Sequence, residues 1–313
     1  MVLGTSLVIV LYGPRLYDYY AAAQYTPSTR VKEMSGKLAL TEEGRRLLYA
    51  SHPQIETDKE FNKDCQSTER TAAMLGCYYK RKIFIYDVQH AELEGAVEVT
   101  TAHEMLHAAY DRLNIFERTE VDAMLRQAYE TVKDEPDIKA LMEYYRKAQP
   151  GTDINELHSI IGATVSSVTP ELEKYYARYF DDRATVVAMN TRYTAVFKQV
   201  EQRAEELSRQ LKTEESSLST DLSSYESDHM QLQTDIESFN QRASSGGFTS
   251  RQAFELARSS LTTRVSTLEA RRSDINARIA SYNSRVEELN ALSVRAKELN
   301  QSINGVAEPT SGL

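Results

Sequence analysis

Two histidines four residues apart, with a glutamate between them, are the residues of this chain best suited to chemistry. They are His103, Glu104 and His107, in the stretch "TAHEMLHAAYDRL" at 101–113. On a helix, residues i and i+4 lie on one face, so both imidazoles can reach one metal ion. Glu104 would lie about 100° around the helix from His103, close enough to take a proton from a zinc-activated water. The alternative is a helix whose histidines only cap a core or face water.

A third ligand must come from elsewhere in the chain, and two residues of "INELHSIIGATV" (154–165) compete for the role. Glu156 and His158 lie two positions apart, about 200° around a helix, so one regular helix cannot direct both at the same ion. Amphipathicity does not choose between them, because the hydrophobic positions lie between the two directions: Leu157, Ile160, Ile161 and Val165.

These two segments resemble the motif helices of thermolysin-like zinc peptidases, the gluzincin group. "VTTAHEMLHAAYDRL" is similar to their V-x-x-x-H-E-x-x-H-A-x-x-D helix, and Asn155-Glu156 matches the Asn-Glu pair of their third-ligand helix. The resemblance implies a Zn2+ ion held by His103, His107 and Glu156. It also implies endopeptidase activity on a peptide or protein substrate, with Glu104 as general base and then proton donor to the leaving amine.

The chain departs from the family pattern at one position. The aspartate that orients a zinc-bound histidine in the family falls here on Ile160, so that role passes to another residue or is absent. His158 has a second reading as a catalytic residue at the cleft edge that stabilises the oxyanion, with Tyr175 and Tyr176 as weaker candidates. The alternatives to a peptidase are a scaffold or adaptor whose zincin domain is inactive, and a spacer whose metal is purely structural.

The elements that must position these residues form a mainly α domain over 28–183, with a small sheet in a zincin-like α+β arrangement. "RKIFIYDV" (81–88) is rich in β-branched and aromatic residues and predicts a strand. By the resemblance, this strand lines the cleft and pairs with the peptide. The segment 52–65 has the composition of a loop. Caps and helical spacing predict helices at 41–51, 66–75, 97–112, 117–133, 136–147, and from 153 and 170 onward.

From residue 186 the chain changes character. Apolar residues recur at steps of three and four through 239 and again from 261 to 303, which is a heptad pattern. "SSGGFTS" (244–250) separates the two runs, so we expect an antiparallel helical hairpin over 186–304, with a flexible tail at 305–313. The alternative is a parallel dimeric coiled coil broken at the glycines. A coiled-coil partner or a homo-oligomer is possible in either case, and polar His229 and Arg272 in the seam would fix its register.

The apolar N-terminus predicts membrane anchoring through residues 1–22. The run from Val2 to Tyr12 is too short to span a bilayer, which needs about 20 residues. It is the end of an anchor, a short interfacial anchor, or a buried strand at 6–12. We favour an anchor because Tyr12, Tyr17, Tyr19 and Tyr20 resemble an interfacial belt.

Charge and cysteine content bound the cellular setting. The 313-residue chain carries a net charge of −9, which argues against nucleic-acid binding because no basic surplus exists to neutralise phosphates. Its two cysteines, Cys65 and Cys77, either close one disulfide in an oxidising compartment or are free thiols. A membrane-anchored, extracytoplasmic protein is the favoured reading. A cytoplasmic one remains if the thiols are free and the apolar run is a strand.

Overall fold

The computed structural model describes residues 16–65, 75–148 and 151–303. It is mainly helical, with one three-stranded sheet and a long helical hairpin, as the sequence predicts. The chain forms two compact units, one of 1–198 with 298–313 and the other of 199–297. The division falls inside helix α10 (Arg183–Ser244), so the start of this helix belongs to the first unit.

The sheet of the first unit has the strand order β1-β3-β2. The central strand β3 (Lys82–Tyr86) pairs in parallel with β1 (Gln54–Glu56) and antiparallel with β2 (Gly76–Tyr79). Both edges of β3 are therefore occupied, and the expectation that this strand pairs with a peptide is wrong. β2 is the edge strand that contacts α5 (Ala96–Asp111), the helix carrying His103 and His107.

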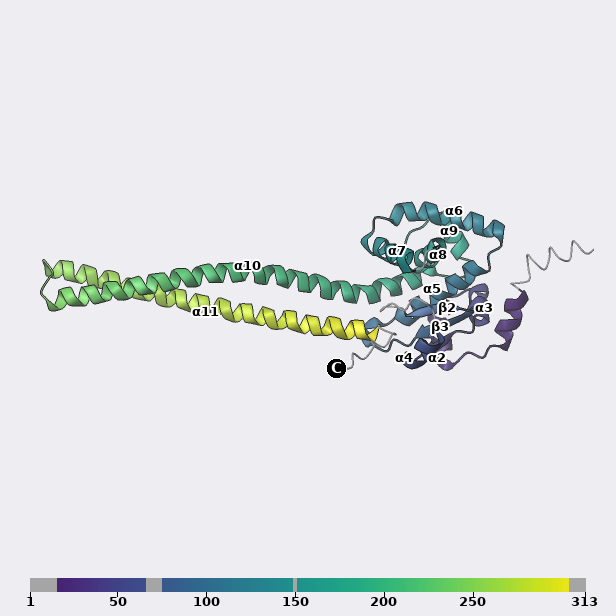
Figure 1. Ribbon diagram of the computed structural model, residues 1–313, viewed down its shortest axis with the longest axis horizontal. Helices are drawn as coiled ribbons and strands as arrows, with labels where there is room; N and C mark the ends of the chain where they lie inside the picture. The colour runs from purple at the N-terminus through teal and green to yellow at the C-terminus, as the bar shows by residue number, and fades with distance from the viewer. Residues whose placement is uncertain (1–15, 66–74, 149–150, 304–313) are drawn as a thin grey trace, which may run out of the picture. The chain divides into compact units, whose positions relative to one another are not determined.

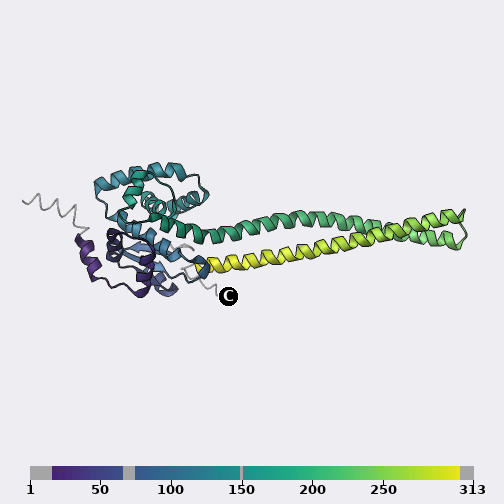
Figure 2. The same ribbon diagram turned by 180° about the vertical axis from the view of Figure 1, so that it is seen from behind.

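Helix α5 lies between the sheet and a group of helices that follows it in the chain (Figure 1). It contacts β2 and β3 on one side and α8 (Asp153–Thr164) on the other, while α2 (Thr29–Lys37) and α3 (Glu42–Ala50) also pack against it. Figure 2 shows the same arrangement from behind. The remaining helices of the group are α6 (Ile115–Val132), α7 (Pro136–Ala148) and α9 (Pro170–Tyr176).

The helix starts follow the capping residues that the sequence provides. Thr41 accepts a hydrogen bond from the Gly44 amide at the start of α3, and Thr169 accepts one from Leu172 at the start of α9, which has proline at its first position. Asn114 and Glu117 form a reciprocal capping box that begins α6. These boundaries agree with the predicted helices to within two or three residues.

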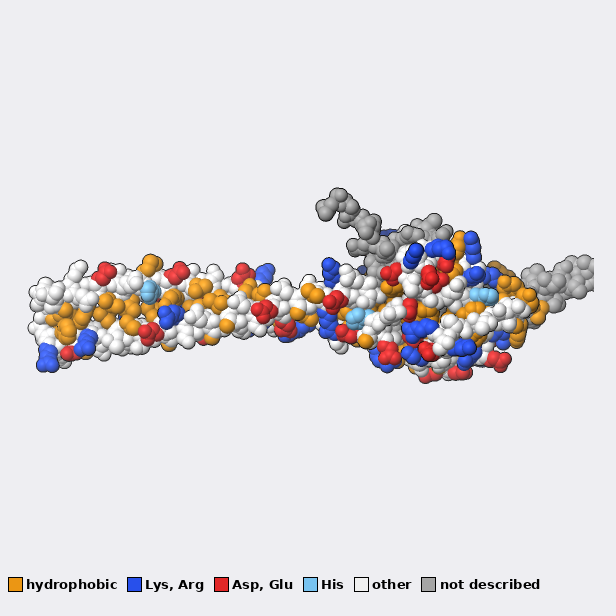
Figure 3. Space-filling model, turned by 90° about the horizontal axis from the view of Figure 1, so that it is seen from below, with side chains coloured by type: hydrophobic (Ala, Val, Ile, Leu, Met, Phe, Trp, Pro, Cys, Tyr) orange, Lys and Arg blue, Asp and Glu red, His pale blue; other side chains and the backbone are white. Residues whose placement is uncertain are grey.

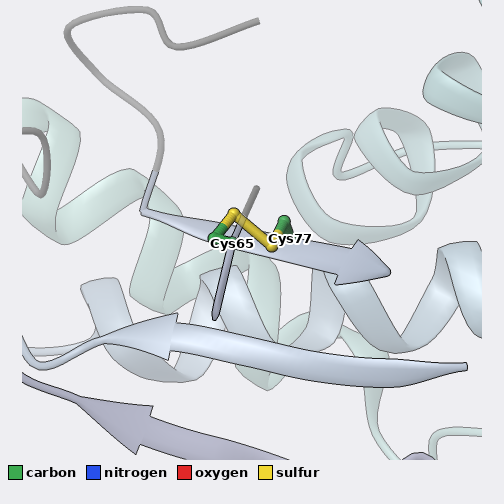
Figure 4. The surroundings of a disulfide bond; sticks show 2 residues. All are labelled: Cys65 and Cys77. Atoms are coloured by element: carbon green, nitrogen blue, oxygen red, sulfur yellow. A yellow bond between two sulfur atoms is a disulfide. The ribbon is translucent and has the colours of Figure 1, made fainter. Parts of the chain in front are cut away.

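The segment 52–65 is not the loop that its composition suggests. It contains β1 and a helix, α4 (Asp58–Asp64), whose Phe61 is buried against the disulfide between Cys65 and Cys77. Figure 4 shows this disulfide beside strand β2, which carries Cys77. The predicted helix at 66–75, the tail at 305–313 and most of the anchor at 1–22 fall outside the described residues.

Residues 16–24 are helical and lie against the end of α5. Asp18 is buried and forms an ion pair of 2.7 Å with Arg112, which caps the C-terminus of α5. The outward side chains of this helix are Leu16, Tyr17, Tyr19 and Tyr20, each more than half exposed. Among the described residues, no helix is both long and apolar enough to cross a bilayer.

The hairpin consists of α10 and α11 (Arg251–Ser302), joined by a turn with Gly246 in the left-handed region. Its arms run antiparallel within 199–297, because Arg203 pairs with Glu288 near one end and Arg264 with Asp235 near the other. Leu207, Leu218, Leu232 and Ile275 are buried in the seam. His229 and Arg272 are exposed beside the seam and not within it, so they do not fix its register as expected.

Candidate metal centre

Helix α5 is buried around almost its whole circumference, which explains its sequence. Apolar and small residues cover most of its surface, as expected for a helix enclosed by other elements. It begins after Gly95, whose φ of 100° favours glycine. Polar side chains on a buried helix need polar partners, and the three polar residues of the motif lie close to one another. His103, Glu104 and His107 lie on the part of α5 that faces β2 and α8.

Helix α8 brings Glu156 to this part of α5 because the two helices pack closely at Gly162. A Cβ added there would lie 2.4 Å from Leu106 Cδ1 and 2.8 Å from Tyr176 Cε1. Ordinary carbon contacts need about 3.5–4 Å, and both neighbours are fully buried with little room to turn aside, so a larger residue would push the helices apart. The glycine therefore sets the separation of the two helices that carry the three candidate ligands.

His103, His107 and Glu156 form a triangle of ligand atoms. The two Nε2 atoms are 3.1 Å apart, and Glu156 Oε2 lies 3.7 Å from His103 Nε2 and 3.5 Å from His107 Nε2. Ligands bound tetrahedrally to zinc at 2.0–2.2 Å are separated by about 3.4 Å. The triangle has this size, so the group can bind a metal ion. His158 is not a member of it.

Two further observations fit a metal at this place. Glu156 is 4% exposed, and its Oε2 is a buried oxygen with no hydrogen-bond partner among the described residues. A buried carboxylate oxygen without a partner is costly unless a cation occupies its lone pairs. His107 Nδ1, the nitrogen away from the triangle, lies 3.1 Å from Asn155 Oδ1, which can accept a hydrogen bond from the Nδ1–H group and so leave Nε2 unprotonated as a ligand. Asn155 is thus placed to orient His107, whereas Ile160 has no polar group that could do so.

The charges of the group are coupled. Burial raises the pKa of Glu156, but the adjacent histidines outweigh it and hold the pKa of this carboxyl below its usual range. Burial lowers the pKa of His107, and Glu156 outweighs it in the opposite direction, so the pKa is raised. The site therefore favours an ionised carboxylate next to positive charge, which is the electrostatic environment that a divalent cation would also provide.

Glu104 lies on the sheet side of the same helix turn. It is 6% exposed, and a Cβ at Gly76 would come within 2.9 Å of its Cγ. Burial raises the pKa of Glu104, while the two histidines and a hydrogen bond from the Tyr78 backbone oppose this shift. Gly76 and Tyr78 both belong to the edge strand β2, so this strand lies directly over the Glu104 carboxylate.

Tyr145 of α7, which is not part of the motif, lies beside this group. Its ring stacks on His103 with centroids 6.5 Å apart and an angle of 18° between the planes. Burial, followed by the charges of Glu156 and Glu104, raises the pKa of Tyr145. The signal was in the sequence: Ile138, Met142 and Tyr145 have helical spacing, and the first two are buried.

His158 lies away from the position expected for a residue at a cleft edge. Its side chain is fully buried, and Nε2 is 2.9 Å from the Tyr175 hydroxyl. Burial and the charge of His107 lower its pKa to about 3, so it is neutral. Tyr176 is also fully buried and donates a hydrogen bond to the His158 carbonyl. These three residues pack behind α8 and join it to α9.

No known family matches this chain, and neither does any curated protein sequence or solved structure.

Proposed function

We propose that this protein is a zinc-dependent peptidase of the zincin type, with His103, His107 and Glu156 as metal ligands and Glu104 as general base. One observation carries the proposal: the triangle of ligand atoms, 3.1–3.7 Å on a side, with a glutamate one position after the first histidine on the same helix. Three protein ligands leave a fourth position open, which is the arrangement of catalytic zinc sites and not of structural ones. A zinc ion there would supply Lewis acidity and a water acidified to a pKa near 7.

Glu104 has the properties needed to move a proton in this setting. It follows the ligand His103 directly and does not belong to the triangle itself, so its carboxylate is free to accept a proton from water. The same carboxyl group can then donate that proton to the leaving amine. Its contact with β2 holds it in place while it does so.

The edge strand β2 supports a peptide as the substrate class. It is an edge strand that contacts Glu104, and an extended peptide can add to a sheet edge through backbone hydrogen bonds. A peptide bound in this way would place a backbone carbonyl beside the ligand triangle. The role that the family resemblance gave to β3 is thus assigned to β2 in our proposal.

The experiment compares zinc content and peptide hydrolysis in four forms of the full chain. We expect about one zinc per chain in the wild type, as three protein ligands and one open position imply. The double variant His103→Ala, His107→Ala should lose the zinc. Glu104→Gln should keep it, because residue 104 is not a ligand, and hydrolysis of a mixed peptide library should fall roughly 10²–10⁴-fold. Glu98→Gln is the matched control, a buried glutamate on α5 paired with Lys37.

Each outcome decides one part of the proposal. Zinc that remains in the double variant would refute the ligand assignment. Zinc binding in all single variants with no hydrolysis in the wild type would refute peptidase activity and favour an inactive scaffold. Equal hydrolysis by the wild type and Glu104→Gln would refute the role of Glu104. Equal losses of hydrolysis in Glu98→Gln and Glu104→Gln would show that both buried glutamates of α5 act only through the fold, and that Glu104 has no separate catalytic role.

A further inference from the structure

The hairpin carries its ion pairs on only one side of the seam. Acidic residues recur every seven positions on α10 and arginines every seven positions on α11, so that each set follows one edge of its helix. Besides Arg203–Glu288, four close pairs connect the arms: Arg278 with Glu214 at 2.9 Å and Asp221 at 2.6 Å, Arg271 with Asp228 at 2.8 Å, and Arg264 with Asp235 at 2.5 Å. We call this set the ion-pair ladder.

The other side of the seam is apolar at five of its eight positions. One position after each acid of the ladder, α10 presents Glu215, Leu222, His229 and Ile236. One position after each of the three ladder arginines, and after Arg285 one heptad further on, α11 presents Val265, Arg272, Ile279 and Val286. None of these eight side chains is buried, and Leu222 is 37% exposed. We call these eight residues the apolar strip. Figure 3 shows hydrophobic side chains gathered along this part of the chain.

The ladder also fixes which residues of the strip lie opposite each other. The pair Asp221–Arg278 places Leu222 level with Ile279, and Asp228–Arg271 places His229 level with Arg272. Glu215, seven residues before Leu222, is then about 10 Å from the Leu222–Ile279 level, and His229 with Arg272 is about 10 Å away on the other side. A carboxylate and two basic groups thus stand at equal distances from one apolar level.

We propose that the apolar strip binds the strip of a second copy of this chain, the two hairpins antiparallel and related by a two-fold axis at the Leu222–Ile279 level. The axis brings Glu215 of each copy opposite His229 and Arg272 of the other, so the same ionic contact forms twice. Self-complementary charge of this kind is what a two-fold interface requires. It also provides partners for Glu215 and Arg272, which have no ion pair within the described part of the chain. The four-helix assembly would cover the exposed Leu222 and its apolar neighbours.

Charge reversal tests the proposal on the full chain. Sedimentation velocity over roughly 1–100 µM, a range in which specific dimers of moderate affinity form, should show a wild-type dimer. Arg272→Glu places like charges opposite each other twice, and we expect the dissociation constant to rise roughly tenfold or more. The double variant Glu215→Arg, Arg272→Glu exchanges the signs and should restore the dimer. Ser227→Glu is the control, an exposed residue of α10 about 120–160° around the helix from the strip.

The outcomes separate this interface from others. A wild type that stays monomeric throughout this range would overturn the proposal, and so would a dimer that Arg272→Glu leaves unchanged, because the contact would then lie elsewhere. A dimer that Arg272→Glu weakens and the double variant does not restore would overturn the pairing of Glu215 with Arg272. Circular dichroism of each variant shows whether the hairpin remains helical, so that loss of the fold is not mistaken for loss of the contact.

Discussion

Substitution of Gly162 by alanine tests whether the close packing of α5 and α8 builds the metal centre. The added Cβ would lie 2.4 Å from Leu106 Cδ1 and 2.8 Å from Tyr176 Cε1, more than 1 Å closer than ordinary contact. Leu106 immediately precedes His107 in the chain, and Gly162 lies on the helix of Glu156. Leu106 and Tyr176 are both fully buried and have little room to turn aside, so we expect part of the strain to push α8 away from α5 and to widen the ligand triangle.

Two opposing contributions set the size of the effect. Overpacking of a core costs about 1–3 kcal/mol, and alanine is favoured over glycine in a helix by about 1 kcal/mol. We expect Gly162→Ala to lower the free energy of unfolding by up to about 2 kcal/mol. The effect on zinc affinity should be larger than the effect on stability, because the distances from Glu156 to the two histidines would increase. Changes next to metal ligands reduce affinity roughly 10–100-fold.

Gly36→Ala is the control, because α2 leaves this position open with no atom within 4 Å of an added Cβ. It should stabilise the protein by up to about 1 kcal/mol. Urea unfolding monitored by circular dichroism gives the stability, and competition with a chromogenic chelator gives the zinc affinity. If Gly162→Ala proves as stable as Gly36→Ala and binds zinc as tightly as the wild type, the helix separation does not determine the site.

Two other predictions concern different parts of the first unit. Glu56 is buried, and this burial, followed by the charges of Asp64 and Glu60, raises its pKa to about 7. The folded state then holds the proton more tightly than the unfolded chain, so the free energy of unfolding should fall as the pH rises from about 4.5 to 7. Glu56→Gln cannot ionise and should not show this fall. In urea unfolding at pH 8 we expect the variant to be more stable than the wild type by up to about 3 kcal/mol. A difference between the two proteins that is the same at pH 5 and pH 8 would contradict it. The chain has no tryptophan, so Tyr19→Trp is a unique fluorophore, and we expect brominated lipids in vesicles to quench it if residues 16–24 lie at a bilayer surface. Tyr144→Trp on α7 should not be quenched, and equal quenching of both, or of neither, would contradict an interfacial position for these residues.

The parts of the site that are local in sequence could be predicted, and those that depend on tertiary packing could not. His103 and His107 follow from a four-residue spacing within one helix, which needs no knowledge of the fold. Glu156 could not be separated from His158 by helix geometry alone, because the choice depends on which face of α8 meets α5. That face is set by Gly162, and the importance of a glycine contact appears only when the opposing helix is known.

The sheet was the least predictable element, for a related reason. β1 has three residues, and its partner β3 lies almost thirty positions further along the chain, so no local pattern predicts the pairing. The composition of 52–65 instead suggested a loop. β2 was missed because Gly76 is a poor strand former, yet that glycine is what allows the strand to approach Glu104. The same glycine therefore lowers the local preference for a strand and provides the space that Glu104 occupies.

The hairpin differs, because its direction could have been inferred from charge. A heptad seam of apolar residues is compatible with an antiparallel hairpin or a parallel dimer, and the seam alone left both open. The acids of the ladder, Glu214, Asp221, Asp228 and Asp235, occupy one heptad position of α10, and its arginines occupy one position of α11. In a parallel dimer of identical α10 helices, this position would place acids opposite acids, which is destabilising. Folding α11 back places each acid opposite an arginine, so the charge pattern selects the hairpin that the structure contains.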